Sequence, residues 1–186
     1  LFRSEAREYL NTLDACSNIL KNITRDTLDY AKLEGRTLEV VVQREAAGRG
    51  GSRHFCDSLR PGSRLQLAGP KNLFRLDETA SRVVLVAGGI GITPLAAMAD
   101  RLRALGTPYV LHYAGRARRH MALLDRLQRA HGAQLVLHVK DEGGRLDLAA
   151  ALAGVDAGTR VYGCGPARLI DALQALAAGW PEGVLR

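Results

Sequence analysis

The residues best suited to chemistry in this sequence lie in the stretch VVLVAGGIGITP, residues 83–94. Its apolar first half predicts a buried parallel strand, and Thr93 with Pro94 predicts a helix start. Three glycines separate the strand from the helix: Gly88, Gly89 and Gly91. Glycines let a ligand approach the backbone closely, and the free N–H groups of a helix start favour anions. The stretch therefore predicts a phosphate-binding corner, with a glycine turn that holds no ligand as the alternative.

A second corner of the same kind occurs at residues 160–166, RVYGCGP. A short apolar strand ends there in four residues that favour a turn: Gly163, Cys164, Gly165 and Pro166. Because the carboxyl ends of parallel strands meet at one edge of a sheet, we expect both corners to lie at the ligand-binding edge. For Cys164, a small buried hydrophobic residue is the alternative to a functional thiol.

The elements that would position these corners alternate regularly from residue 81 onward. The predicted strands are 82–87, 109–114, 134–139 and 160–162, and the predicted helices are 95–105, 121–130, 147–152 and 167–178. This alternation with short loops predicts an α/β fold with a doubly wound parallel sheet.

The first part of the chain has a different pattern. Apolar residues at three- and four-residue spacing predict a helix over residues 4–32. Residues 37–44 and 64–68 predict strands. Ser52 predicts the cap of a short helix over residues 53–59, after a glycine-rich turn.

The composition excludes several classes of function. The 186 residues carry 26 Lys and Arg against 19 Asp and Glu, a net charge of +7. The basic residues are spread along the chain, apart from one cluster at residues 116–120, and no aromatic platform is interleaved with them. We therefore expect no nucleic-acid partner, and a basic face suits anionic cofactors and an acidic electron-transfer partner. No run of eighteen apolar residues is present, so we expect no membrane span.

Three cysteines, Cys16, Cys56 and Cys164, are too few and too scattered for a disulfide framework or a metal cluster. They suit a reducing cytoplasm. The five histidines show no ligand spacing, so we expect no metal site. Because the first residue is Leu1 rather than methionine, we expect a fragment or a processed form.

The motifs GGIGITP (88–94) and YGCGP (162–166), in this order, resemble the NAD(P)H-binding domain of the ferredoxin–NADP reductase superfamily. Within it, the chain is most similar to the phthalate dioxygenase reductase and vanillate O-demethylase reductase group. Residues 48–52 resemble the flavin-phosphate segment of that group, and residues 64–74 resemble its last barrel strand. Residues 180–183, WPEG, resemble the segment before its iron–sulfur domain.

The resemblance implies a reductase that passes hydride from NAD(P)H to FMN, and then single electrons to a [2Fe–2S] centre. That centre would pass the electrons on to a Rieske-type oxygenase or demethylase of aromatic catabolism. NADH and FMN are the expected cofactors, with NADPH and FAD open, and a [2Fe–2S] centre is expected only if a C-terminal domain is present. A terminal oxygenase component or a ferredoxin is the expected partner. The implied parts are an N-terminal helical segment (1–36), a partial antiparallel flavin-binding β-barrel (37–78) and an NAD(P)H-binding domain (79–186).

The resemblance also implies roles for single residues. Thr93 would lie near the nicotinamide, and Cys164 would lie beside its C4 atom and act by shape and polarisability. Arg116 would meet the adenosine half of the cofactor. Arg118 and Arg119 could receive a 2′-phosphate, with a solvated basic loop as the alternative. The pyrophosphate would approach the backbone of Gly88, Gly89 and Gly91, and the turn around Cys164 would be shaped by Gly163, Gly165 and Pro166. The flavin phosphate would be bound by Gly50, Gly51, Ser52 and Arg53. For these four residues, a hairpin-type turn is the alternative.

The chain departs from the group at both ends. The flavin-binding R-x-Y-S-L motif is not intact, since residues 7–10 read REYL, and the cysteine-rich [2Fe–2S] module is absent. Residues 10–40 faintly resemble the second dimerisation helix of sensor histidine kinases, and an amphipathic helix that covers a barrel face is the alternative. Two other functions therefore stay open: a flavin-free nucleotide-binding module that is inactive alone, and a dimerisation or signalling module.

Overall fold

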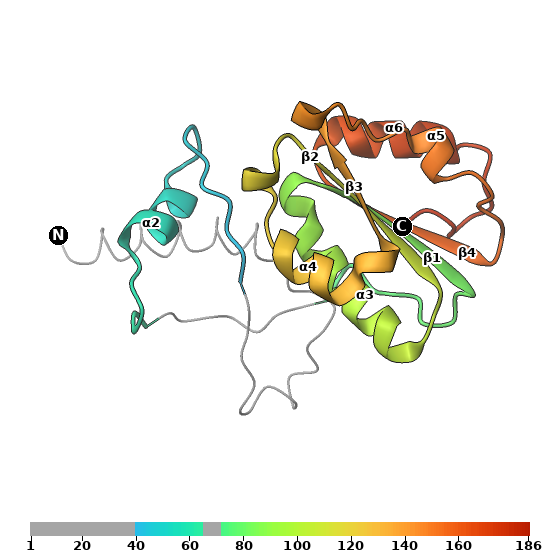
Figure 1. The fold of residues 1–186 in the computed structure, drawn as a ribbon, viewed down its shortest axis with the longest axis horizontal. Helices are drawn as coiled ribbons and strands as arrows, with labels where there is room; N and C mark the ends of the chain where they lie inside the picture. Colours follow the sequence, from blue (N-terminus) through green and yellow to red (C-terminus); the bar gives the residue numbers. More distant parts are fainter. Residues whose placement is uncertain (1–39, 65–71) are drawn as a thin grey trace. The chain divides into compact units, whose positions relative to one another are not determined.

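A computed structural model describes residues 40–64 and 72–186 of the chain (Figure 1). The chain forms two compact units, residues 1–75 and 76–186, and each is described by itself. The predicted helix over residues 4–32 lies outside the described residues, as does most of the predicted strand 64–68. The division into three parts stays a prediction.

Unit 76–186 is built on a four-stranded parallel sheet. Its strands are β1 (Arg82–Gly88), β2 (Tyr109–Gly115), β3 (Leu135–Val139) and β4 (Thr159–Cys164). They lie in the order β3-β2-β1-β4, and every pair is parallel. Residues 83–87 of the central strand β1 are fully buried, as expected for a strand covered on both faces. The predicted doubly wound α/β fold is confirmed.

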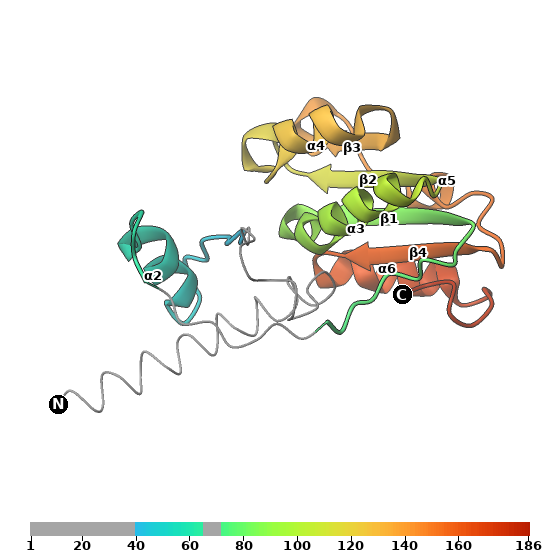
Figure 2. The same ribbon diagram turned by 90° about the horizontal axis from the view of Figure 1, so that it is seen from below.

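Helices cover both faces of this sheet. Helices α3 (Ile92–Leu105) and α4 (Leu124–His131) lie on one face, and α5 (Leu148–Ala151) and α6 (Ala167–Ala177) lie on the other (Figures 1 and 2). On the face covered by α5 and α6, apolar residues of the sheet and of its covering segments form one buried cluster. That cluster centres on Val84, Val86, Val161, Leu173 and Val184.

Two helix starts differ from the predicted ones for local reasons. Helix α4 was expected from Met121 but begins at Leu124, because Leu123 has a left-handed φ of 61° that no α-helix admits. Helix α5 begins at Leu148 because Asp147 is its N-cap, with the carboxylate accepting a hydrogen bond from the Ala150 N–H.

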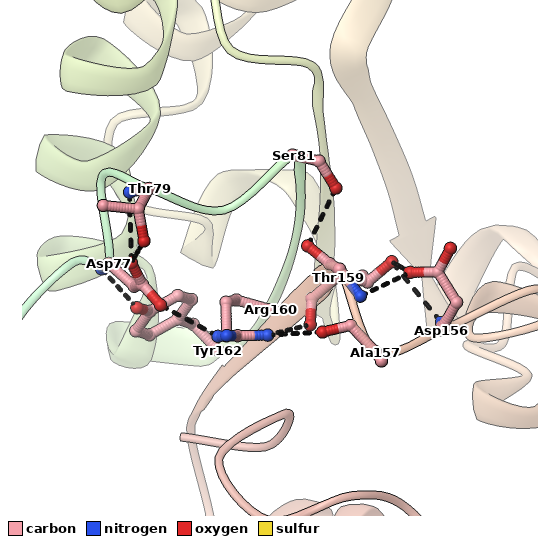
Figure 3. A network of polar contacts seen from close by, with 9 residues as sticks. Asp77, Thr79, Ser81, Asp156, Ala157, Thr159, Arg160 and Tyr162 are labelled. Carbon is pink, nitrogen blue, oxygen red and sulfur yellow. Dashed lines mark hydrogen bonds and ion pairs between the residues drawn. The ribbon is translucent and has the colours of Figure 1, made fainter.

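A polar network lies at the end of the sheet where β1 and β4 begin (Figure 3). We call it the entry network, and its members here are Asp77, Thr79, Arg160 and Tyr162. The Asp77 N–H donates to the hydroxyl oxygen of Tyr162 at 2.7 Å, and Arg160 Nε donates to the Asp77 carboxylate at 2.9 Å. Hydrogen bonds from Thr79, followed by Arg160, lower the pKa of Asp77. The entry network thus fastens the segment before β1 to β4.

Residues 184–186 run beside the outer edge of β4 in the parallel direction. The Val161 N–H donates to the Val184 carbonyl at 2.8 Å, and the Arg186 N–H donates to the Val161 carbonyl at 2.9 Å. This short segment therefore pairs with β4 on the side that β1 leaves free.

The described part of unit 1–75 contains helix α2 (Gly51–Ser58). The prediction of a helix over 53–59 capped by Ser52 is wrong at its start: Gly50, with φ 99°, is the N-cap. Ser52 lies inside the helix, and its hydroxyl accepts a hydrogen bond from the Glu45 N–H at 3.0 Å. Residues 40–44 of the predicted strand 37–44 belong to no strand, and no segment of the described part of the chain forms a ladder with them.

Candidate functional site

The two glycine corners come together at the carboxyl edge of the sheet. In the register of β1 and β4, Ala87 lies opposite Cys164. A Cβ atom built on Gly91 would lie 2.1 Å from the Cys164 carbonyl oxygen, and one built on Gly165 would lie 3.0 Å from the Gly88 Cα atom. These glycines are therefore required for backbone contact between the corners, which any larger residue would force apart.

Gly89 differs from the other glycines of this edge. It has φ +56°, it is exposed, and no atom lies within 4 Å of its Cβ position. It opens the 3₁₀ helix η2 (Gly89–Gly91), which leads directly into α3. Its backbone therefore faces open space at the start of two consecutive helical segments, where unpaired N–H groups attract anions.

Thr93 and Pro94 lie one and two residues inside the first turn of α3, so the helix opens at Ile92 rather than at Thr93. Pro94 fits there because the N–H groups of a first turn have no intrahelical acceptor. The Thr93 hydroxyl donates to the Ile90 carbonyl at 3.1 Å, and the side chain is buried. Thr93 therefore links η2 to α3, which is a structural role. Its role near the nicotinamide stays a prediction.

A cavity of about 810 Å³ opens beside the Gly88–Gly89 corner. Three of its lining residues lie side by side on neighbouring strands: Gly88 of β1 pairs with Ala114 of β2, and Ala114 pairs with His138 of β3. The apolar wall comes from α5, α6 and the loop before α5: Leu146, Leu148, Leu169 and Ala172. The lining also includes four cationic residues, Arg116, Lys140, Arg145 and Arg168, and, among residues 40–64 and 72–186, no acidic one.

Cys164 lies at the end of β4, beside β1, and is not among the lining residues of this cavity, whereas Pro166 and Arg168, which follow it, are. Its thiol is free and half-buried, and burial raises its pKa. The thiol is therefore protonated at neutral pH and suited to packing rather than to nucleophilic attack. A Cβ atom on Gly163 would meet the Leu173 side chain at 2.5 Å, and Pro166 is the N-cap of α6, so the turn around Cys164 is tightly fixed.

The basic residues after β2 have separate surroundings. Arg118 makes a bidentate ion pair with Glu142, with Nε and Oε1 2.8 Å apart, and this lowers the pKa of Glu142. Arg116 Nε lies 3.8 Å from the Asp141 carboxylate, and its side chain is 80% exposed. Arg118 and Arg119 line a smaller hollow beside α4, while Arg116 lines the large cavity. The predicted basic loop is therefore divided between two surfaces.

A histidine pair, not predicted as a site, lies beneath the cavity. His112 Nδ1 and His138 Nε2 are 3.0 Å apart, and the two rings are stacked. Burial, with a smaller effect of His138, lowers the pKa of His112 to about 4. Burial also lowers the pKa of His138, which lines the cavity. At neutral pH the pair is uncharged, so one ring nitrogen donates to the other.

The predicted flavin-phosphate residues lie in the other unit, at the start of α2. The N–H groups of Gly51, Ser52 and Arg53 have no intrahelical acceptor, because the first helical bond runs from His54 to Gly50. The Ser52 hydroxyl is buried against the Glu45 N–H, while Arg53 is exposed.

Comparison with known proteins bears on what such an edge does. No family model matches the chain. The beta subunit of phenoxybenzoate dioxygenase from Ectopseudomonas oleovorans is 42% identical over 183 residues, which cover 95% of this chain and 57% of the relative. The solved structure of phthalate dioxygenase reductase, described as modular for electron transfer from pyridine nucleotides to [2Fe–2S], matches with a TM-score of 0.72 and 34% identity. That match covers 77% of this chain and 46% of the reductase.

The chain is thus similar in sequence and in structure to proteins of the phthalate dioxygenase reductase group. An intact self-sufficient cytochrome P450 monooxygenase of type IV also contains a similar part, with a TM-score of 0.75 and 49% identity. That match covers 78% of this chain and 19% of the monooxygenase. The chain spans about half the length of the curated relatives it matches.

Two further observations limit the site. Within residues 40–64 and 72–186, no group of three or more His, Cys, Asp or Glu side chains could hold a metal ion. No helix in the same described ranges is long and apolar enough to cross a membrane.

Proposed function

We propose that the chain is the nucleotide-binding part of an NAD(P)H-dependent flavin oxidoreductase that serves a Rieske-type oxygenase or demethylase. The observation that carries this proposal is the carboxyl edge of the sheet, where the glycine corner lines a cationic cavity and Cys164 ends the neighbouring strand. A dinucleotide has an anionic centre and two aromatic ends, so it would use the corner and both of its sides. The relatives that carry reductase names support the same assignment.

The residues present fit a nicotinamide dinucleotide. Gly89 offers exposed backbone in open space, and Arg168, at the start of α6, adds a guanidinium to the same cavity. Together these groups would hold the pyrophosphate by charge-assisted hydrogen bonds. The apolar wall of Leu146, Leu148 and Leu169 would accept the adenine, which is flat and largely apolar on its faces.

The nicotinamide would then lie on the Cys164 side of β1. When bound, NAD(P)H supplies a hydride to the flavin. The protein supplies position: the Gly91 contact fixes Cys164 against the β1 corner, and Thr93 holds η2 on α3. The protonated, half-buried Cys164 thiol would pack beside the reacting ring and exclude water.

We assign FMN as the flavin, with its phosphate at the start of α2. Three N–H groups without an intrahelical acceptor and the exposed Arg53 side chain there fit a phosphate dianion. The side chain of Ser52 would serve less directly, because its hydroxyl oxygen already accepts from Glu45.

The electrons would leave the flavin singly for a [2Fe–2S] centre and a terminal oxygenase component or ferredoxin. A [2Fe–2S] cluster takes four ligands, and the sequence contains three cysteines, so the cluster would belong to another polypeptide segment.

The test is an anaerobic visible spectrum of the purified chain with FMN, before and after NADH or NADPH. A bound-flavin band that the reduced nucleotide bleaches is the expected result. In parallel, titration calorimetry of Arg168→Ala should show about tenfold weaker nucleotide binding, the effect of one lost charge-assisted hydrogen bond. Arg129→Ala, on α4 and outside the cavity, is the matched control and should bind normally. Nucleotide binding without flavin reduction would indicate a flavin-free binding module, and no binding would refute the proposal.

A further inference from the structure

We propose that Lys140 and Arg145 form a second anion subsite in the large cavity, and that this subsite selects NADPH over NADH. The ligand chemistry is a phosphate monoester on the adenosine ribose, in addition to the pyrophosphate. This inference rests on the proposed function, because it concerns the same nucleotide.

Lys140 and Arg145 lie after a different strand from the glycine corner. Lys140 directly follows β3, and the neighbouring Val139 pairs with Gly115 of β2. The glycine corner belongs to β1, which lies two strands away from β3. With an interstrand spacing of ~4.8 Å, the ends of β1 and β3 are roughly 10 Å apart. The cations at the end of β3 are thus separate from the pyrophosphate corner, on the adenosine side of it.

The cavity carries more positive charge than a pyrophosphate alone would use. Gly89 and Arg168 already provide for the pyrophosphate. Lys140 and Arg145 make no ion pair with any acidic residue in the described ranges, and no acidic residue lines the cavity. NADH would leave both charges unmatched, whereas the extra dianion of NADPH would match them.

Two acidic residues, Asp141 and Glu142, directly follow Lys140 in the chain. A protein that selects NADH places a free carboxylate where it accepts from the ribose hydroxyls. Both oxygens of Glu142 are engaged by Arg118, at 2.8 and 2.9 Å. Asp141 faces Arg116, whose backbone carbonyl also accepts from the Asp141 N–H at 2.9 Å. Neither carboxylate lines the cavity, so neither neutralises Lys140 nor binds the ribose diol.

The assignment moves the phosphate subsite from Arg118 and Arg119, which the sequence suggested, to the loop after β3. Arg118 is held by Glu142, and both arginines open toward the hollow beside α4.

The experiment is titration calorimetry of the chain with NADH and with NADPH at low and at moderate salt. The wild-type chain should bind NADPH at least about tenfold more tightly, as expected for one or two additional charge-assisted hydrogen bonds. The double variant Lys140→Gln/Arg145→Gln should lose that preference by weakening NADPH alone. Arg129→Gln is again the control, since it removes a cation outside the cavity. Thermal melting checks that the variants are folded.

The outcomes separate the two proposals. If NADH binds as tightly as NADPH or more tightly, the subsite is refuted while the proposed function stands. If the double variant weakens both nucleotides equally, the two cations act as a general attraction, and the subsite is again refuted. If neither nucleotide binds to the wild-type chain, both proposals fail.

Discussion

Replacing Gly91 by alanine tests whether the two glycine corners must touch. The new Cβ atom would lie 2.1 Å from the Cys164 carbonyl oxygen and 2.4 Å from its carbonyl carbon. An ordinary contact is 3.4 Å, so the Cys164 backbone would have to retreat by roughly 1.3 Å. Overpacking of this kind costs about 1–3 kcal/mol. We expect about 3 kcal/mol, because the obstacle is backbone that is hydrogen-bonded in a central sheet.

Urea unfolding followed by circular dichroism measures this cost. With an m-value of about 2 kcal/mol per molar, a loss of about 3 kcal/mol lowers the midpoint by about 1.5 M. Gly132→Ala is a matched control, because Gly132 has φ −41° and no atom within 4 Å of its Cβ position. Its midpoint should change by less than a third as much. A Gly91→Ala midpoint equal to that of Gly132→Ala would refute the claim that these corners are in backbone contact.

Two more predictions concern the buried polar groups. Tyr162→Phe removes the oxygen that accepts from the Asp77 N–H in the entry network, and it should cost about 1 kcal/mol in urea unfolding, because a partly buried donor loses its partner; an unchanged midpoint would contradict this. His112 has a pKa of about 4 in the folded chain and an ordinary 6.5 when unfolded, so the unfolded chain binds its proton first as the pH falls. Stability should therefore be full above about pH 6.5 and fall toward pH 4, and His112→Asn should flatten that fall, whereas an equally steep slope in the variant would contradict the assignment.

The sequence predicts the sheet well, because periodicity and glycine position are local signals. The predicted strands 82–87 and 109–114 each differ from β1 and β2 by one terminal residue. The start of α4 was missed because a left-handed Leu123 has no signature in residue type. The start of α2 was missed because Gly50, rather than Ser52, supplies the cap, and the Ser52 hydroxyl is engaged elsewhere.

The candidate site was predicted only where it lies on the two glycine motifs. The cations of the cavity come from the segments after β2 and after β3 and from α6, so no spacing in the sequence relates Arg116 to Lys140 or Arg168. One signal was available: Lys140 follows a predicted strand directly, and such residues gather at the carboxyl edge of a parallel sheet. The pairing of His112 with His138 depends on the register of β2 and β3, which residue types alone do not determine.

The short segment 184–186 has a consequence for self-association. A strand at the border of a sheet exposes unpaired N–H and C=O groups, which recruit strands from other molecules. On β4, the backbone groups of Val161 are already occupied by Val184 and Arg186. A chain cut before Val184 would present β4 as an open template next to the most hydrophobic strand of the sheet. Residues 184–186 therefore block intermolecular β-pairing at this edge and reduce the tendency to aggregate.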